Sequence, residues 1–369
     1  MIAQLRRLVV PGLVIQAVLV GGGYATGREL VEFFLTMGPA SGLAGMALTA
    51  LMFSVSAMIS FELARRFQAH DYNSFMRLLL GRWQWLFELG YLATLTLVLA
   101  VVSAASSELL HTLCGLPPVL GGFLFMLVVA ILVFFGNRMV ERVISAWSIV
   151  FYITYGALFI LVLARFGPAM GTAIASEPLR PAATLWNALS YAAYNVPLVP
   201  VLIFVARNFT TRREALVAGA ITGPLVLLPG FAFLLTLSAF YPAILQAPLP
   251  IWTVLDRLGA PAITVAIQFV VLGALIKTGV GLLHGFNERL ARAAFERDRS
   301  LPRLVRPAVA VVLILVAVYA ATTIGLVDLI GTGYRYSALY FLAIFITPLL
   351  TIGLWRLLKP GTENQDAAT

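Results

Sequence analysis

The sequence predicts an all-α integral membrane protein with ten transmembrane helices in a 5+5 inverted repeat, of which helices 1 and 6 are discontinuous. Three observations lead to this prediction. First, the 369 residues are 61% hydrophobic and 11% charged, whereas a soluble domain is about 45–50% apolar and about 25% charged. Second, ten long apolar stretches divide into two halves of similar length. Third, one stretch in each half is interrupted by helix-breaking residues at a matching depth.

Each apolar stretch is long enough to span a bilayer, which takes about 20 residues in a helix. Helices are expected because lipid offers no partner to an unpaired backbone group. The predicted spans are Leu8–Phe34, Gly42–Leu63, Trp85–His111, Val119–Phe135, Val143–Leu163, Leu185–Phe204, Ala215–Tyr241, Ala262–Phe286, Pro307–Ile324 and Tyr336–Leu358.

Basic residues set the direction of the spans, because short loops rich in Lys and Arg stay in the cytoplasm. With both termini inside, most basic residues fall in cytoplasmic segments, and the external loops hold only Arg165, Arg180 and Arg257. We therefore expect a multi-pass protein of the bacterial cytoplasmic membrane with both termini cytoplasmic. A cleaved signal peptide after Arg6 and Arg7 is the alternative for the first span, but apolar character resumes beyond Gly27.

The chain divides into a first repeat (1–165), a second repeat (182–358) and a polar tail (359–369). Five spans per half make the second half run upside down relative to the first. Gly21–Gly27 interrupts the first span and Asn195–Pro200 the sixth, each about 20 Å into its helix at about 1.5 Å per residue. Glycine weakens a helix, and proline removes an amide donor. Paired interruptions of this kind indicate a transporter's binding site, although close helix packing and simple kinks are the alternatives.

The glycine-rich break carries a family resemblance. The segment VGGGYATGREL from Val20 to Leu30, with Thr278-Gly279-Val280-Gly281 and Phe286-Asn287-Glu288-Arg289, resembles the YkvI-like amino-acid permeases of the amino acid, polyamine and organocation superfamily. The resemblance covers essentially the whole chain. It implies the five-plus-five inverted-repeat fold of the leucine transporter, in which the eighth span faces the break in the first and sodium-driven members bind sodium between the two.

Lys277 stands in the middle of the eighth span, too deep to reach water easily. A lysine inside a span is costly and therefore suggests a function. From the resemblance we expect Lys277, beside Thr278, to take the place of sodium and to bond to carbonyls freed around Gly21–Gly23. Its protonation and release would couple transport to protons. The alternative is a structural lysine that is permanently paired with one acid.

Three charged residues follow the first break. Arg28 and Glu32 have the i, i+4 spacing of a helical ion pair, so we expect them to satisfy each other, while Glu29 points about 100° away. Glu29 is then the freer carboxylate. It is expected to accept a proton or to contact a substrate amine in the cavity, and an external helix-end charge is the equal alternative.

Other charges lie near the ends of the spans. Asp328 and Arg335 bracket a Gly331-Thr332-Gly333 segment before the last span, and we assign them, with Arg28 and Glu32, to an external gate. Three glutamates lie beside arginines near cytoplasmic ends and are interpreted as structural ion pairs, with gates as the less favoured alternative: Glu62, Glu88 and Glu288.

The substrate site is expected where the two breaks meet. The half-helix that starts near Gly27 presents backbone amides that suit a carboxylate. Tyrosines before the second break offer a ring and a hydroxyl, with an interfacial belt as the alternative, and Ser103 could equally be a helix contact. The candidate substrate-binding residues are Gly21, Gly22, Gly23, Tyr24, Thr26, Gly27, Ser103, Tyr191, Tyr194 and Asn195.

These features favour a secondary active transporter that moves a small organic solute, in the first place an amino acid, by alternating access. The expected coupling ion is a proton. The alternative is a sodium-coupled or uncoupled carrier of an amine or another small organic solute. A channel is less favoured because the charges are too sparse for a continuous polar pore lining.

Other functional classes lack their motifs. The sequence has no G-x-x-x-x-G-K-[ST] segment for ATP and no acid, base or metal set for an intramembrane enzyme. Its single cysteine, Cys114, and three scattered histidines give no metal motif, so neither a metal nor a cofactor is expected. The net charge of +9 is explained by basic residues in the cytoplasmic loops. The lipid bilayer is therefore an expected partner, and nucleic acid is not.

Overall fold

The computed structural model describes residues 2–135, 138–295 and 305–359, and the regular elements of this part of the chain are helices. By length and composition, seven helical segments in it can cross a membrane: Pro39–Arg66, Tyr72–Cys114, Ile149–Ala175, Arg212–Ser238, Pro261–Asn287, Pro307–Ile324 and Leu326–Leu358. Pro118–Phe134 is apolar but shorter. The two broken helices, expected as spans one and six, are not among these seven segments, and each is divided into separate pieces.

The first half follows the predicted spans. The first span is divided into pieces, as expected, and a short helix that was not expected precedes the third span. In order, the elements are α1 (Ile2–Leu19), α2 (Gly22–Thr26), α3 (Arg28–Leu30), the π-helical η1 (Val31–Leu35), α4 (Pro39–Arg66), α5 (Tyr72–Leu80), η2 (Gly81–Trp83), α6 (Gln84–Cys114), α7 (Pro118–Phe135) and α8 (Arg138–Ala175).

The second half repeats this pattern, with a broken helix first and a short helix, α12, between long ones. Its elements are α9 (Pro181–Asn195), α10 (Leu198–Val201), η3 (Ile203–Asn208), α11 (Arg212–Ser238), η4 (Ala243–Gln246), α12 (Pro250–Leu258), α13 (Pro261–Phe295), α14 (Val305–Ile324), α15 (Leu326–Asp328), η5 (Leu329–Gly333), α16 (Tyr334–Phe341), η6 (Leu342–Ile346), η7 (Leu349–Gly353) and α17 (Leu354–Leu358).

Local sequence signals explain where several helices begin and end. Thr211 and Glu214 form a capping box at the start of α11. The side chain of each residue accepts a hydrogen bond from the backbone amide of the other. Asp71 caps α5 by accepting from the Ser74 amide at 3.0 Å. Gly115 ends α6 with a φ of +67°, the left-handed conformation that glycine adopts without strain.

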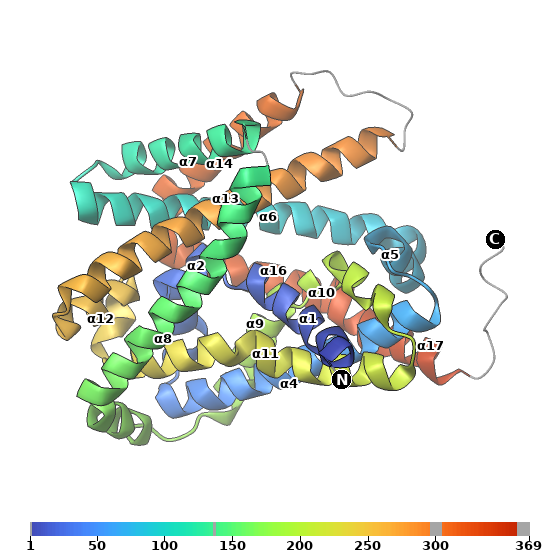
Figure 1. Cartoon of the computed structure of the whole chain (residues 1–369), viewed down its shortest axis with the longest axis horizontal. Helices are drawn as coiled ribbons and strands as arrows, with labels where there is room; N and C mark the ends of the chain where they lie inside the picture. Colours follow the sequence, from blue (N-terminus) through green and yellow to red (C-terminus); the bar gives the residue numbers. More distant parts are fainter. Residues whose placement is uncertain (1, 136–137, 296–304, 360–369) are drawn as a thin grey trace.

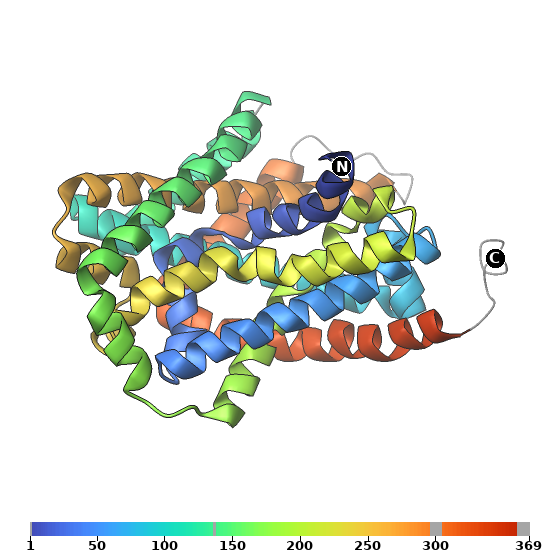
Figure 2. The ribbon, with the colours of Figure 1, turned by 60° about the horizontal axis from the view of Figure 1, so that its bottom comes forward.

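The long helices form two groups (Figures 1 and 2). In one group α4 and α11 lie side by side, with α1 against α11 and α9 against α4. In the other group α6 packs on α7, α13 and α14. The helix α8 contacts both groups through α11 and α13, and α2 reaches across to α13. The pieces of the first broken helix therefore lie between the two groups.

Small residues allow the close approach of α4 and α11. A Cβ on Gly223 would collide with the carbonyl of Ala50, and one on Gly219 would collide with the backbone of Met58. The Ser54 hydroxyl donates to the carbonyl of Ala220 at 2.7 Å across the same contact. Tight contacts between small residues and hydroxyl-to-carbonyl bonds are typical of helix pairs in lipid.

The structure corrects two expected boundaries. The last helical segment begins at Leu326, about ten residues before the expected start at Tyr336. The Gly331-Thr332-Gly333 segment, expected to lie before the last span, belongs to the π-helical η5, which joins α15 directly to α16. The helices α5 and α12 were not expected, since both are too short to be spans.

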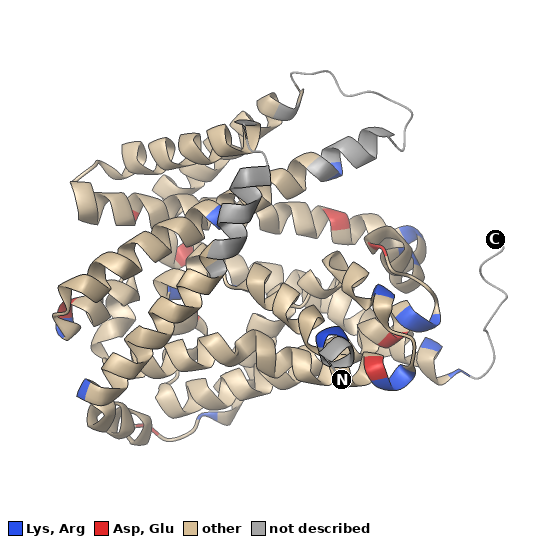
Figure 3. Cartoon of the chain, viewed as in Figure 1, with Lys and Arg blue, Asp and Glu red and all other residues tan. Residues whose placement is uncertain are grey.

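Charge is distributed unevenly between the two ends of the helices. Figure 3 shows Lys and Arg gathered at the end where α5 and the C-terminal part of α17 lie, and few at the end where α12 lies. This is the asymmetry that the sequence predicts between cytoplasmic and external ends. The basic residues Arg297, Arg299 and Arg303, and residues 360–369 of the predicted tail, lie outside the described residues.

Candidate functional site

The first break interrupts the backbone hydrogen bonding between α1 and α2. The helix α1 ends at Leu19, and Gly21 has extended backbone with φ −106° and ψ −167°. The Gly21 amide donates to the carbonyl of Leu19 at 2.8 Å, instead of to the Ala17 carbonyl four residues earlier as in a continuous helix. The carbonyl of Ala17 is therefore left for another donor.

Two neighbouring residues of α13 satisfy the groups freed on either side of this break. The Lys277 ammonium donates to the Ala17 carbonyl at 2.7 Å. The Gly22 amide, on the other side, donates to the Thr278 hydroxyl at 2.9 Å. The sequence predicted that Lys277 bonds to a freed carbonyl near Gly21–Gly23, and the carbonyl that it meets lies one turn earlier.

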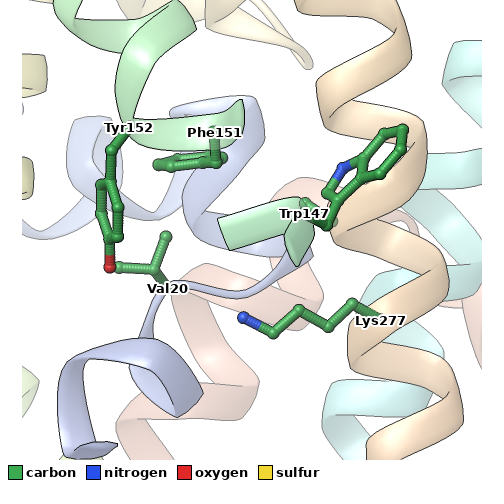
Figure 4. A pocket seen from close by; sticks show the side chains of 6 residues that line it. Val20, Trp147, Phe151, Tyr152 and Lys277 are labelled. Atoms are coloured by element: carbon green, nitrogen blue, oxygen red, sulfur yellow. The ribbon is translucent and has the colours of Figure 1, made fainter. Parts of the chain in front are cut away.

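A small pocket adjoins the Lys277 side chain. It has room for about one water molecule. Figure 4 shows the Lys277 side chain reaching from α13 toward the linker that carries Val20. The lining residues are Val20, Trp147, Phe151, Tyr152, Ala274 and Lys277.

The second break lies between α9 and α10. The helix α9 ends at Asn195, Val196 and Pro197 form a turn, and only four helical residues follow before the 3₁₀ segment η3. Proline lacks the amide that would continue the helical hydrogen bonds. The Asn195 side-chain amide donates back to the carbonyl of Tyr191 at 3.1 Å, so it stabilises the end of α9.

One buried hydrogen bond joins the two broken helices. Glu29 lies just beyond the first break and is 6% exposed, and its Oε1 accepts from the hydroxyl of Tyr194, just before the second break. Its other oxygen, Oε2, faces Gly23, where a Cβ would lie 3.2 Å from it. Within the described part of the chain Glu29 forms no ion pair. Of the alternatives left open by the sequence, Glu29 is therefore an inward-facing carboxylate.

Aromatic rings surround this carboxylate and form what we call the aromatic cluster, consisting of Phe33, Tyr191, Tyr194 and Tyr334. The ring centroids of Tyr194 and Tyr334 lie 4.7 Å apart, those of Tyr191 and Tyr194 lie 5.4 Å apart, and that of Phe33 lies 5.5 Å from both Tyr191 and Tyr194. The hydroxyl of Tyr191 is buried, and it has no hydrogen-bond partner among the described residues. The tyrosines predicted from the sixth span are thus core residues near Glu29 and not an interfacial belt.

Tyr334 is the member of this site that the sequence did not suggest. It opens α16, directly after Gly333, and its hydroxyl would lie 3.8 Å from a Cβ on Gly23. A tyrosine next to a segment expected to lie before the last span gives no local signal of burial. Only the contact between α9 and α16 brings it to Glu29.

The other predicted substrate residues are placed around this centre, and not all of them face it. The buried Tyr24 hydroxyl points at Gly230 of α11, where a Cβ would collide with it. The Thr26 hydroxyl donates to the carbonyl of Gly23 at 2.7 Å within its own turn. The hydroxyl of Ser103 lies against Gly122 of α7, 3.1 Å from where its Cβ would be, which is the helix-contact alternative.

Three of the charged residues that the sequence assigns to a gate form a linked group. Arg28, 3% exposed, pairs with Glu32 at 2.7 Å as the i, i+4 spacing predicts. Arg335 adds a second contact to Glu32 at 3.6 Å. Arg28 also donates to the carbonyls of Leu245 at 2.8 Å and Ala247 at 3.3 Å, at the end of η4. These contacts join the first broken helix to the segment that connects α11 with α12.

Asp328 does not belong to this group. It is exposed, and no ion pair between it and Arg335 occurs among the described residues.

Another tyrosine, beyond the end of α11, bonds to a carboxylate: the Tyr241 hydroxyl donates to Glu177 at 2.7 Å. Burial and this carboxylate raise the pKa of Tyr241, which remains a hydrogen-bond donor at neutral pH.

A second charged group lies where α13, α6 and α5 meet. Arg289 of α13 pairs with Glu88 of α6, and its guanidinium carbon lies 4.6 Å from the ring centre of Tyr72 and 4.0 Å from that of Tyr91. Glu62 pairs with Arg65 at 2.8 Å, as its sequence neighbourhood suggests. The side chain of Glu288 lies outside the described residues.

Metal binding has no evident donor set here. In the described ranges no group of three or more His, Cys, Asp or Glu side chains could hold a metal ion. The carboxylate at the centre of the site, that of Glu29, is near the phenol groups of Tyr191 and Tyr194 and the side-chain amide of Asn195.

Solved structures of membrane transporters have a similar fold. The manganese transporter of Eremococcus coleocola, in complex with an aromatic bis-isothiourea compound, aligns with a TM-score of 0.57 and 18% identity over 92% of this chain and 77% of the transporter. A mutant form of that transporter aligns with a TM-score of 0.58 over 93% and 78%. A Na⁺-coupled sialic acid symporter aligns with a TM-score of 0.48 and 13% identity over 94% and 86%.

Sequence comparisons add nothing to this likeness. No family model matches the chain, and no curated protein matches it significantly. The likeness to the manganese transporter, at 18% identity, is one of fold. The described part of the chain is therefore helical with several apolar spans, as in a multi-pass membrane protein, and its fold is similar to that of a solved manganese transporter.

Proposed function

We propose that this protein is a secondary transporter of a small organic solute that carries an amino group, and that it works by alternating access. An amino acid, favoured by the sequence, and an amine are the two candidate solutes. The ten spans would form two inverted repeats of five, as in the YkvI-like permeases that the sequence resembles. The protein would lie in the bacterial cytoplasmic membrane with both termini inside.

The observation that carries the proposal is the buried bond between Glu29 and Tyr194. It joins the residue after one helix break to the residue before the other, between two groups of helices. Irregular backbone at membrane depth is tolerated only where protein or a ligand cavity satisfies it, and paired broken helices are typical of solute sites in transporters. A carboxylate at that place would bind an amino group.

Lys277 supports a coupling role for the neighbouring site. Its ammonium occupies the freed Ala17 carbonyl beside the first break, where the resemblance implies sodium in sodium-driven relatives. We propose that charged Lys277 holds the break in one arrangement and that loss of its proton releases it. Thr278 would keep the other side of the break in place through the Gly22 amide.

Uptake into proteoliposomes tests the proposal. The purified protein should accumulate a radiolabelled amino acid or amine above its external concentration when the external pH is lower than the internal pH, with saturation at high solute. A sodium gradient alone should drive no accumulation. A flux that does not saturate and never exceeds equilibration would contradict a transporter, and accumulation driven by sodium would contradict the role given to Lys277.

A further inference from the structure

Glu29 forms no ion pair among the described residues, and the cation closest to its aromatic cluster, Arg335, lies 5.7 Å from the centre of the Phe33 ring and pairs with Glu32. Arg28 is adjacent in sequence, but its guanidinium pairs with Glu32 and donates to the carbonyls of Leu245 and Ala247. The ammonium of Lys277 donates to the Ala17 carbonyl at 2.7 Å. The cations nearest to Glu29 therefore have other partners, so a positively charged group of a ligand is the partner that an ionised Glu29 lacks.

The aromatic cluster suits an organic ammonium group. Phe33, Tyr191, Tyr194 and Tyr334 surround the carboxylate, and cations are attracted to the faces of aromatic rings. Tyr191 brings a hydroxyl that is fully buried and unpartnered among the described residues. The Tyr194 hydroxyl bonds to Glu29 in the position where an ammonium hydrogen would bond.

A carboxylate on the solute has no comparable place. The first amide of α2, that of Gly22, is already bonded to Thr278. Beside Gly23, the Glu29 carboxylate already fills the space, since its Oε2 lies 3.2 Å from where a Cβ would be. The α-carboxylate of an amino acid would lie beside Glu29 in a buried site, where two like charges repel strongly.

We propose that the solute is a primary amine with an apolar or aromatic body and no carboxylate. Glu29 binds its ammonium group, the rings of the aromatic cluster surround the adjoining carbons, and like-charge repulsion excludes the corresponding amino acid. This inference rests on the proposed transport function and decides between its two candidate solutes. The Tyr194 hydroxyl is displaced from Glu29 when the amine binds.

Matched pairs of ligands test the inference on the purified full-length protein. Tyramine is compared with tyrosine, and isoamylamine with leucine, by isothermal titration calorimetry in lipid nanodiscs, with isoamyl alcohol as the uncharged analogue. We expect the amines to bind at least about tenfold more tightly than their amino acids, and the alcohol not to bind. An amino acid that binds as tightly as its amine, or amines that do not bind, would overturn the inference.

Variants connect the binding to the named residues. Glu29→Gln keeps the size of the side chain and should weaken amine binding at least about tenfold, whereas Glu177→Gln, an external carboxylate paired with Arg180, should leave it unchanged. Tyr194→Phe keeps the ring and frees Oε1, so it should retain amine binding. Equal amine affinity in Glu29→Gln, or lost affinity in Tyr194→Phe when that variant is folded by circular dichroism, would contradict the assignment.

Uptake separates this inference from the proposed function. Concentrative uptake of leucine without uptake of isoamylamine would leave the transport function intact and refute the amine preference. If neither solute is concentrated although isoamylamine binds, the amine site stands and the transport function fails.

Discussion

Lys277 and Arg28 are both cations held inside the helical bundle, and each donates to backbone carbonyls that regular helix hydrogen bonding does not use. Lys277 bonds to Ala17 at the end of α1, and Arg28 bonds to Leu245 and Ala247 in a connecting segment. Arg28 has in addition a carboxylate, Glu32, at 2.7 Å. The two residues thus differ in what their removal would leave unpaired.

Replacing Lys277 should remove the pH dependence of transport. In Lys277→Gln the side chain can still donate to the Ala17 carbonyl but cannot lose a proton, so the part of the pH dependence of solute uptake that comes from this residue should disappear. Lys359→Gln, a lysine beside Trp355 at the end of α17, is the matched control and should keep the wild-type profile. An unchanged profile in Lys277→Gln would remove this lysine from the coupling mechanism.

Removing Arg28 should destabilise the protein much more than removing an exposed arginine. Arg28→Ala leaves Glu32 without its nearest partner in a mostly buried place, a change that costs about 3–5 kcal/mol when a buried pair is broken. Arg180→Ala breaks the exposed pair with Glu177, which is worth about 0–1 kcal/mol. Thermal melting of both variants in detergent measures the difference, and similar melting temperatures would show that Arg335 alone satisfies Glu32.

At the scale of elements, the broken helix depends on its neighbour α13. The pieces α1 and α2 do not share a continuous ladder of hydrogen bonds, and Lys277 and Thr278 bond to the two sides of the gap. Gly22 brings α2 close to α13, because a Cβ there would lie 3.2 Å from the Cα of Leu275 and even closer to its side chain. The geometry of the break therefore depends on the contact with α13 as well as on the glycines themselves.

Substituting Gly22 should separate α2 from α13. In Gly22→Ala the new methyl group pushes against the Leu275 backbone and lengthens the bond between the Gly22 amide and Thr278, so both solute affinity and melting temperature should fall. We expect a loss of about 1–3 kcal/mol in stability, as for overpacked sites. Gly156→Ala in α8, where no atom lies within 4 Å of the new Cβ, should be neutral, and an equally neutral Gly22→Ala would mean that α2 can shift at no cost.

At the scale of the whole molecule, two charged groups link helices on different sides of the central site. Arg28, Glu32 and Arg335 form one group, and Arg289 and Glu88, which join α13 to α6, form the other. Glu29 and its aromatic cluster lie buried between them. Alternating access requires that one group open while the other stays closed, so each is a candidate gate.

Breaking the Arg289 contacts should shift the protein toward a state open at the α5 end. Spin labels on Arg77→Cys in α5 and His284→Cys in α13, in a Cys114→Ser background, report the distance between these helices. Arg289→Gln removes the ion pair with Glu88 and the contacts to the Tyr72 and Tyr91 rings, so longer distances should become populated. Arg82→Gln, which changes an exposed arginine whose guanidinium lies 5.3 Å from the Trp83 ring, is the control. Unchanged distances in Arg289→Gln would make the Arg289 group structural.

Much of this architecture follows from the sequence alone, because the properties that determine it are local. Apolar length sets where a helix can span, glycines and prolines interrupt it, and i, i+4 spacing pairs Arg28 with Glu32. Both predicted breaks are present, ending α1 at Leu19 and α9 at Asn195. The inverted repeat and the transport role were inferred from the same local signals and stay predictions.

The partners of the buried charges were decided only by the tertiary structure. Glu29 meets Tyr194, and Lys277 meets the carbonyl of Ala17, across 165 and 260 residues of sequence. Tyr334 reaches the site through the packing of α16 on α9, and Ser103 turns toward α7. Spacing along a helix fixes which residues share a face, but which face meets which depends on how all the helices pack together, and no local pattern contains that information.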